Sequence, residues 1–197
     1  MSVSERIQEV ELRALLPTLR PIKEKLSTLG AQFKGTRKIH DVYFCPKEAT
    51  SFADVEMDKV GSYSLRLRQE EEGNNRKSFL NSKTITTKGD HYAWEEHDVT
   101  VGDFTEARRL LEATKFKAFC EIVKTRDEFA LSDVSVNLEN IENFGGVIEV
   151  EKMVARGQEP AAKRELMEVL SSLGIDESCL VKKSVTNIIM HQRAAFG

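Results

Sequence analysis

The sequence predicts an α+β fold built on about eight strands in a largely antiparallel sheet. Charged and apolar residues alternate in several segments with the period of two that marks a strand. Most of these segments follow one another through short turns or one helix, which favours antiparallel neighbours. A flat sheet would leave the charged face in solvent and cover the apolar face with helices. A closed barrel would turn the charged face inward and seat the helices outside.

Length and composition favour one soluble domain over residues 1–197, large enough to bury a core. The net charge of −3 argues against a general nucleic-acid binder. Cys45, Cys120 and Cys179 lie far apart without metal-ligand spacing, which is typical of reduced thiols in the cytoplasm. No signal peptide is recognisable, and no apolar run approaches the roughly 20 residues of a membrane span. The sequence therefore predicts a cytoplasmic protein without nucleic-acid or membrane partners.

The N-terminal half is predicted to contain one helix among five strands. Residues 7–15 alternate as a strand, and residues 16–29 keep the helical spacing of apolar side chains until Gly30. Further strands are expected at residues 39–44, 62–69, 79–88 and 92–101. The polar segments 70–75 and 89–90 are expected to form the turns between the last three strands.

The C-terminal half is predicted to contain three strands and three helices. Asp103 can cap a helix that runs to about Thr114. The strands are expected at residues 119–129, 134–138 and 147–153, with a turn at residues 142–146 before the last. Amphipathic spacing then predicts helices at residues 159–173 and 184–193.

Counting along the predicted strands collects eleven charged side chains on one face. They are Glu9, Glu11, Glu139, Glu149 and Glu151, with Arg13, Arg66, Arg68, Lys88, Lys124 and Arg126. Apolar residues such as Val10, Leu67, Ile85 and Val150 fall on the opposite face, and Lys83 is expected to point away from the charged set. Divalent cations bridge carboxylates, while Arg and Lys match phosphate oxygens. A metal-bound triphosphate would satisfy both halves of this face.

Each pattern alone is most often a solvated strand face with exposed ion pairs. Their joint occurrence on separate strands, with apolar residues opposite, favours a binding surface. The four histidines are scattered without metal-ligand spacing and are expected at the surface or the edge of the core. Asp41 and Tyr43 are expected to pack and to form hydrogen bonds rather than to take part in chemistry, and Trp94 is expected to pack.

The order of seven motifs resembles the CYTH superfamily, the triphosphate tunnel metalloenzymes. The motifs are EVELR (9–13), HDVYF (40–44), YSLRLR (63–68), TTKGD (86–90), IVKTR (122–126), NLENIENFG (137–145) and VIEVE (147–151). The similarity extends over residues 7–190. The superfamily includes class IV (CyaB-type) adenylyl cyclases, thiamine triphosphatases and inorganic triphosphatases.

The resemblance implies an eight-stranded antiparallel β-barrel, or tunnel, whose polar lumen binds a triphosphate with Mg²⁺ or Mn²⁺. It implies catalytic roles for Glu9, Glu11 and Arg13, which match an opening ExExK motif with Arg in place of the usual Lys. The implied phosphate-binding residues are Arg66, Arg68, Lys88, Lys124, Arg126 and Lys183. The implied metal ligands are Glu9, Glu11, Glu139, Glu149 and Glu151. Glu139 stands where the family has Asp, and Val185 stands where its K-S-Y motif has Tyr.

The expected activity is metal-dependent hydrolysis of a triphosphate-containing small molecule: ATP, inorganic triphosphate or thiamine triphosphate. If the ribose 3′-hydroxyl attacks instead of water, the protein would be an adenylyl cyclase that forms cyclic AMP and pyrophosphate. A non-catalytic polyphosphate- or nucleotide-binding module is a third possibility. An RNA-binding face is disfavoured because the interleaved carboxylates would repel the backbone. The chain is expected to be a monomer or a homodimer.

Overall fold

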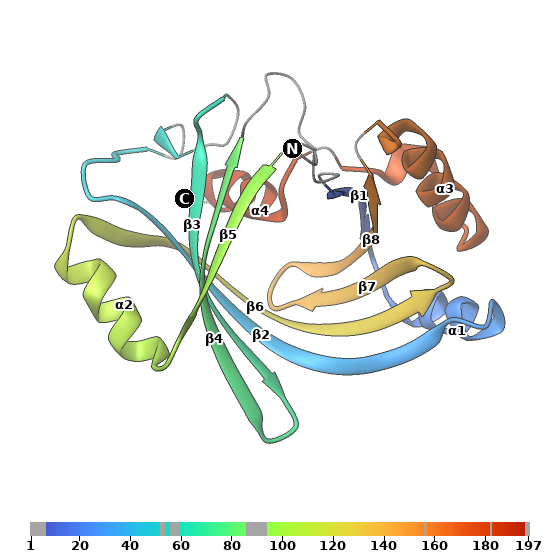
Figure 1. The fold of residues 1–197 in the computed structure, drawn as a ribbon, viewed down its shortest axis with the longest axis horizontal. Coiled ribbons are helices and arrows are strands. Elements are labelled where there is room, and N and C mark those ends of the chain that lie inside the picture. The colour runs from blue at the N-terminus through green and yellow to red at the C-terminus, as the bar shows by residue number, and fades with distance from the viewer. Residues whose placement is uncertain are drawn as a thin grey trace, which may run out of the picture. The chain divides into compact units, whose positions relative to one another are not determined.

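The computed structural model describes residues 7–51, 54–55, 60–85, 94–155, 157–181 and 183–195 (Figure 1). The strands are β1 (Ile7–Leu16), β2 (Gln32–Pro46), β3 (Tyr63–Glu72), β4 (Asn75–Ile85), β5 (Trp94–Val101), β6 (Phe116–Leu131), β7 (Val134–Ile141) and β8 (Gly145–Ala155). The helices are α1 (Arg20–Thr28), α2 (Phe104–Ala113), α3 (Glu159–Ser172) and α4 (Val185–Ala195), with a 3-10 turn, η2, at Glu177–Cys179.

The eight strands form one antiparallel sheet in the order β1-β8-β7-β6-β2-β3-β4-β5. Adjacent strands β3, β4 and β5 are joined as hairpins, as are β7 and β8, whereas β1 pairs with the distant β8. The predicted α+β class and its eight-stranded antiparallel tunnel-type sheet are confirmed. Of the helices that the structure describes, none has the length and apolar character needed to cross a membrane.

The chain divides into two compact units. The first unit comprises Met1–Thr36 and Thr125–Lys182, and the second comprises Arg37–Lys124 and Lys183–Gly197. Strands β2 and β6 each contribute residues to both units. The interpretation of residues 1–197 as one domain stays a prediction.

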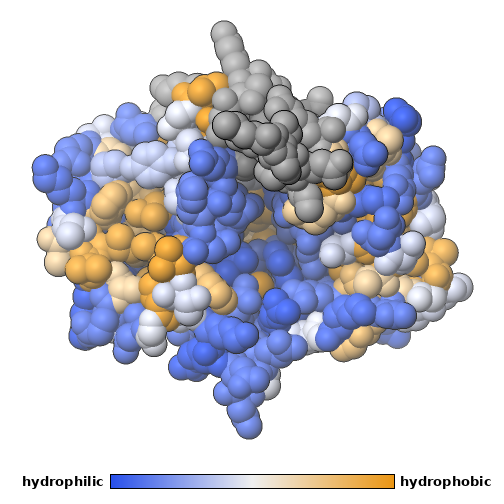
Figure 2. Space-filling view, in the orientation of Figure 1, coloured by the Kyte–Doolittle hydropathy of each residue, from blue (hydrophilic) through white to orange (hydrophobic). Residues whose placement is uncertain are grey.

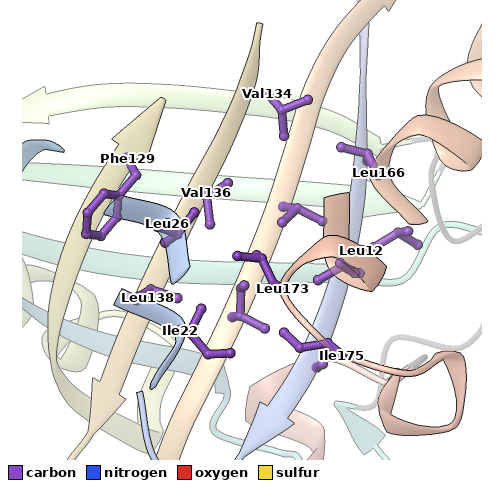
Figure 3. Close-up of a cluster of buried hydrophobic side chains, with 14 of the residues drawn as sticks. Leu12, Ile22, Leu26, Phe129, Val134, Val136, Leu138, Leu166, Leu173 and Ile175 are labelled. Atoms are coloured by element: carbon purple, nitrogen blue, oxygen red, sulfur yellow. The ribbon is translucent and has the colours of Figure 1, made fainter. Parts of the chain in front are cut away.

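The core of the first unit is formed by the apolar face of its strands and by α1 and α3 (Figure 3). Val10, Leu12 and Ala14 alternate along β1, so their side chains share the face that packs against the helices. The helices contribute residues at helical spacing: Ile22 and Leu26 from α1, and Ala162, Leu166 and Leu170 from α3. This arrangement leaves the intervening polar residues of β1 and β8 on the opposite face.

The core of the second unit gathers around β2, β3 and α2. Val42, Phe44, Leu67 and Leu111 are its buried members. As predicted, Asp103 caps α2, because its Oδ1 accepts a 2.9 Å hydrogen bond from the Glu106 amide. Figure 2 shows that the tip of the β3–β4 hairpin, at the bottom of the view, is hydrophilic.

Several strands are longer than the sequence pattern predicts. Residues 70–72 were expected in a turn, but they extend β3 because Glu70 stands opposite Lys77 and Glu71 opposite Arg76. Opposite charges at facing positions stabilise an antiparallel pair. The turn instead lies at residues 73–74, where Gly73 adopts a φ of 57°. Strand β2 likewise begins at Gln32, seven residues before its predicted start at residue 39.

Candidate functional site

The first unit presents the predicted charged face on β1, β8 and β7. Arg13 stands opposite Glu149, and Glu11 stands opposite Glu151. Because facing residues of an antiparallel pair point to the same side, these four side chains share one face. That face lies opposite the buried Leu12 and Val150, as the alternation along the strands predicts.

Three of these side chains join two more in a continuous ion-pair chain, which we name the Arg13 network: Glu11, Arg13, Arg126, Glu139 and Glu149. Arg13 Nε donates a 2.6 Å hydrogen bond to Glu149 Oε1, and its NH2 donates to Glu11. Arg126 Nε donates at 2.7 Å to Glu139 Oε1, and its NH2 also lies 3.4 Å from Glu149 Oε2. Three carboxylates and two guanidinium groups leave the network one net negative charge.

Burial makes the charges of the Arg13 network depend on one another. Glu139 is 1% exposed and Glu149 is 8% exposed, so each carboxylate needs its guanidinium partner. Burial lowers the pKa of Arg13, but the charges of Glu149 and Glu11 outweigh it and hold this pKa above its ordinary value. Arg13 therefore remains a cation fixed between two carboxylates.

The two remaining predicted metal ligands lie beside this network. Glu9 is half-buried opposite Met153, and Glu151 is half-buried opposite Glu11. Carboxylate oxygens are the donors that Mg²⁺ and Mn²⁺ prefer, so the side chains fit such an ion in chemistry. Among the described residues, however, no three His, Cys, Asp or Glu side chains gather closely enough to hold a metal ion. In the Arg13 network, the carboxylates pair with Arg13 and Arg126 rather than with one another around an ion.

The second unit gathers bases around a buried acid, in what we name the Asp41 cluster: Asp41, Arg66, Arg68 and Lys124. Asp41 on β2 faces Arg68 on β3, which donates to both of its oxygens, from Nε at 2.6 Å and from NH2 at 2.8 Å. Arg66 Nε and Lys124 Nζ each lie 3.9 Å from an Asp41 oxygen. Three cations and one anion give the cluster two net positive charges.

Electrostatics keep Asp41 ionised, because these cations surround it. Burial raises the pKa of Asp41, but the hydrogen bonds and charge of Arg68, with the charges of Arg66 and Lys124, outweigh it. The pKa of Asp41 therefore lies well below its ordinary value. Arg66 is less satisfied, since its buried Nε has no hydrogen-bond partner among the described residues. A buried donor without an acceptor is costly, and an anionic oxygen would relieve it.

Sequence reasoning placed Lys83 on the wrong face. Arg66 faces Asn81 across β3 and β4, and Lys83 follows two residues later on β4, so all three share a face. Ile85 has the same parity and was also assigned to the wrong side. A shift of one residue moves every side chain of a strand to the other face. The error arose because alternation was counted back from Lys88, across a segment whose regularity the sequence does not guarantee.

Strand β5 adds two acids that the sequence analysis missed. Asn81 Nδ2 donates to Glu96 Oε1 at 2.6 Å and to Asp98 Oδ1 at 2.5 Å, and Lys83 Nζ lies 3.0 Å from Glu96. Burial raises the pKa of Glu96, but Lys83 and Asn81 outweigh it and hold this pKa below its ordinary value. The alternation of Glu96 and Asp98 along β5 was the signal that could have identified them.

Two predicted phosphate-binding residues remain to be located. Lys88 lies outside the described residues. Lys183 is exposed and stands just before α4, whose first turn is supported by a 3.1 Å hydrogen bond from the Asn187 amide to Ser184 Oγ. The structure therefore brings Arg66, Arg68 and Lys124 together and does not associate Lys183 with them through any described contact.

Comparison with known proteins identifies a family over most of the chain. The family model of the CYTH domain matches residues 8–185. A protein of Methanocaldococcus jannaschii, named as a proposed adenylate cyclase, is 25% identical over 178 residues, which is 89% of this chain and 95% of that protein.

Solved structures share the fold over nearly the whole chain. One protein of Pyrococcus horikoshii has a TM-score of 0.78 at 23% identity and covers 94% of this chain and 99% of its own. A second protein of that organism has a TM-score of 0.72 at 26% identity and covers 91% and 98%. A Hippeastrum protein, described as a proposed adenylyl cyclase with a dominant triphosphatase activity, has a TM-score of 0.61 at 16% identity and covers 96% of each chain.

Proposed function

The chain belongs to the CYTH domain family, and from this premise we propose that it is a metal-dependent phosphohydrolase acting on a triphosphate. Family members are generally metal-dependent. The Arg13 network and the Asp41 cluster would supply the two kinds of contact that such a substrate needs. Carboxylates suit a divalent cation, and clustered Arg and Lys suit phosphate oxygens.

The observation that carries the proposal is the unsatisfied donor of the Asp41 cluster. Arg66 Nε is buried without a hydrogen-bond acceptor, next to Arg68 and Lys124 and with two net positive charges in the cluster. Phosphate oxygens would accept from Arg66 and complement that charge. A protein that used these residues only for folding would gain nothing from leaving a buried guanidinium donor unpaired.

In this proposal, Glu11 and Glu149 are the main residues that would hold Mg²⁺ or Mn²⁺, with Glu9, Glu139 and Glu151 beside them. When bound, the ion supplies a Lewis acid that screens phosphate charge and positions the attacking oxygen. Arg13 and Arg126 carry the positive charge that these carboxylates balance in the structure described here. We assign Arg13 and Arg126 to phosphate contacts once substrate is bound.

Catalysis would then rest on positioning and on charge rather than on a dedicated base. Arg66, Arg68 and Lys124, together with Lys88 and Lys183, would orient the phosphate chain so that a water molecule attacks the terminal phosphorus in line. The bond from that phosphorus to the bridging oxygen breaks, so the diphosphate part of the substrate departs as the leaving group, and the attacked phosphorus with the water oxygen becomes inorganic phosphate. Fixed cations near the breaking bond stabilise the charge that develops on the leaving group.

A second candidate is adenylyl cyclase activity, in which the ribose 3′-hydroxyl of ATP attacks and cyclic AMP and pyrophosphate form. The name of the Methanocaldococcus jannaschii relative favours it. The activity described for the Hippeastrum protein supports hydrolysis, although that likeness itself shows only the fold. We rank hydrolysis first because the described residues explain phosphate recognition and none of them defines an adenine pocket.

One assay separates these activities. The purified protein is incubated with ATP, inorganic triphosphate or thiamine triphosphate, with Mg²⁺ or Mn²⁺, and phosphate, pyrophosphate and cyclic AMP are quantified. We expect phosphate release that EDTA abolishes. Cyclic AMP as the main product from ATP would reverse the ranking, and metal-dependent binding without any turnover would indicate a binding module.

A matched pair of variants links the assay to the site. Glu11→Gln removes one proposed metal ligand, and we expect a loss of activity of about a hundredfold or more. Glu165→Gln makes the same change on α3, where Glu165 pairs with Lys152, and should leave activity unchanged. Equal activity in both variants would refute the assignment of Glu11.

Three cysteines without described disulfides accord with the cytoplasmic location that we propose. Cys45 and Cys120 are buried as free thiols, and Cys179 is an exposed free thiol. Exposed free thiols persist in a reducing compartment. Fractionation of the native organism would test this location.

A further inference from the structure

Asp41 is a buried ion to which the proposed reaction assigns no task. It is 0% exposed, on a strand whose neighbours Val42 and Phe44 belong to the apolar core. A carboxylate removed from water is costly unless it is paired and hydrogen-bonded. Arg68 meets that requirement through a two-point contact with both oxygens. The pair could be replaced by apolar residues if it served only stability.

The distinctive feature of Asp41 is the number of cations that share it. Arg66 approaches one carboxylate oxygen and Lys124 approaches the other, each at 3.9 Å. The cations come from two strands, β3 and β6, and the acid from a third, β2. Without a central anion, the buried Lys124 and the half-buried Arg66 and Arg68 would repel one another and would turn toward separate positions.

Glu70, an acid that also lies near this cluster, does not fill the same position. Glu70 Oε1 lies 3.5 Å from Arg68 NH1, but Glu70 Oε2 also pairs with Arg37 at 3.5 Å. The ion pairs described for Glu70 do not extend to Arg66 or Lys124. Among the ion pairs of the described residues, those of Asp41 reach all three bases.

We propose that Asp41 is a positioning residue that holds Arg66, Arg68 and Lys124 in the arrangement that receives the phosphate chain. This inference rests on the proposed function. Asp41 would not touch the substrate; it would act through the three bases. An ordered cluster loses less conformational freedom when a ligand binds, and this order increases affinity. We expect that gain to be larger than the affinity lost because Asp41 neutralises one positive charge.

The test compares two buried aspartates. Asp41→Asn removes the charge at the centre of the cluster. Asp127→Asn is the matched control, because Asp127 is also buried, accepts a 2.5 Å hydrogen bond from Thr36 Oγ1 and pairs with Lys23. Neither partner is a proposed phosphate contact. Thermal unfolding, steady-state hydrolysis of inorganic triphosphate and calorimetric binding of the non-hydrolysable imidotriphosphate are measured for both variants.

We expect both variants to lose stability and only Asp41→Asn to lose affinity. Its KM for triphosphate should rise about tenfold to a hundredfold, with a much smaller change in kcat and a parallel rise in the Kd of imidotriphosphate. Asp41→Glu restores the charge, displaced by one methylene, and should recover part of the affinity. A purely structural role would move the unfolding temperature without this difference between KM and kcat.

Three outcomes overturn the proposal. One is a KM of Asp41→Asn within about twofold of the natural protein, and another is an equal rise in KM for Asp127→Asn. If Asp41→Asn does not fold, Asp41→Glu is used as the test variant. The third outcome that overturns the proposal is an unchanged KM in Asp41→Glu. If the natural protein neither hydrolyses triphosphate nor binds imidotriphosphate, the proposed function fails as well. Turnover by the natural protein with an unaffected Asp41 variant refutes the role of Asp41 alone.

Discussion

Arg13 on β1 and Glu149 on β8 stand directly opposite each other, and Arg13 Nε donates a 2.6 Å hydrogen bond to Glu149 Oε1. The other arm of the same guanidinium binds Glu11. A lysine at this position could not reproduce both contacts, because its ammonium is a compact point charge, whereas the guanidinium is a planar fork. Arg13 therefore competes directly with any metal for two proposed ligands.

The first prediction concerns this competition. Arg13→Lys should free one carboxylate and tighten Mn²⁺ binding in the absence of phosphate by about threefold to tenfold. The free Mn²⁺ signal in electron paramagnetic resonance measures this affinity without relying on turnover. Arg164→Lys, an exposed position on α3, is the control and should bind Mn²⁺ like the natural protein. An unchanged Mn²⁺ affinity in Arg13→Lys would show that the ion pairs do not limit metal binding.

Glu139 is predicted to stabilise the first unit through Arg126. It is 1% exposed and accepts the 2.7 Å hydrogen bond from Arg126 Nε. Glu139→Gln removes the closer of the two counter-charges of the half-buried Arg126 guanidinium and should lower the free energy of unfolding by about 3 kcal/mol. Urea unfolding measures the loss. The exposed Glu168→Gln on α3 should change it by less than about 0.5 kcal/mol, and a similar small change for Glu139→Gln would contradict the burial argument.

Asp41 is predicted to make stability depend on pH in the acid range. Its pKa is held below the ordinary value, so its ion pairs contribute fully above the unfolded pKa of about 3.9 and are lost as pH falls toward the folded pKa. The free energy of unfolding of the natural protein should exceed that of Asp41→Asn by about 3 kcal/mol at pH 7. This difference should shrink below about pH 4. Urea unfolding at a series of pH values measures it. A constant difference down to pH 2 would contradict the prediction.

Lys83 is predicted to take part in substrate binding, because it shares a face with Arg66. Lys83→Ala should raise the KM for triphosphate about fivefold and change kcat less. Lys77→Ala, at an exposed position of the same strand, provides the comparison and should leave both values unchanged. If the two variants behave alike, Lys83 has no role beyond its ion pair with Glu96.

Much of the fold follows from local pattern. The alternation of Glu9 to Arg13 and of Val147 to Glu151 identified two strands and their faces, and Asp103 identified the start of α2. These features depend on neighbours in the chain, so the sequence contains them. The same logic failed on β4, where the face of each residue was counted back from Lys88. Alternation determines the face of a residue only along an uninterrupted regular strand.

The candidate site was predicted only in part. Arg66, Arg68 and Lys124 were recognised as bases, and Asp41 was expected to form hydrogen bonds, which it does. That all four meet could not be read from the sequence, since Asp41 and Lys124 lie 83 positions apart. Asp98 was missed because its facing partner, Asn81, is uncharged, and Glu96 was missed because its facing partner, Lys83, had been assigned to the other face.

The sequence by itself determined the strands, the polar face of β1 and β8, and the family. Periodicity and motif order are properties of the amino-acid sequence and can be read without a three-dimensional structure. Tertiary structure alone decided which acid binds which base: Arg13 joins Glu11 to Glu149, and Arg68 joins Asp41. Strand register sets these partners, because Coulomb energy depends on distance in space and on burial, neither of which is written in residue order.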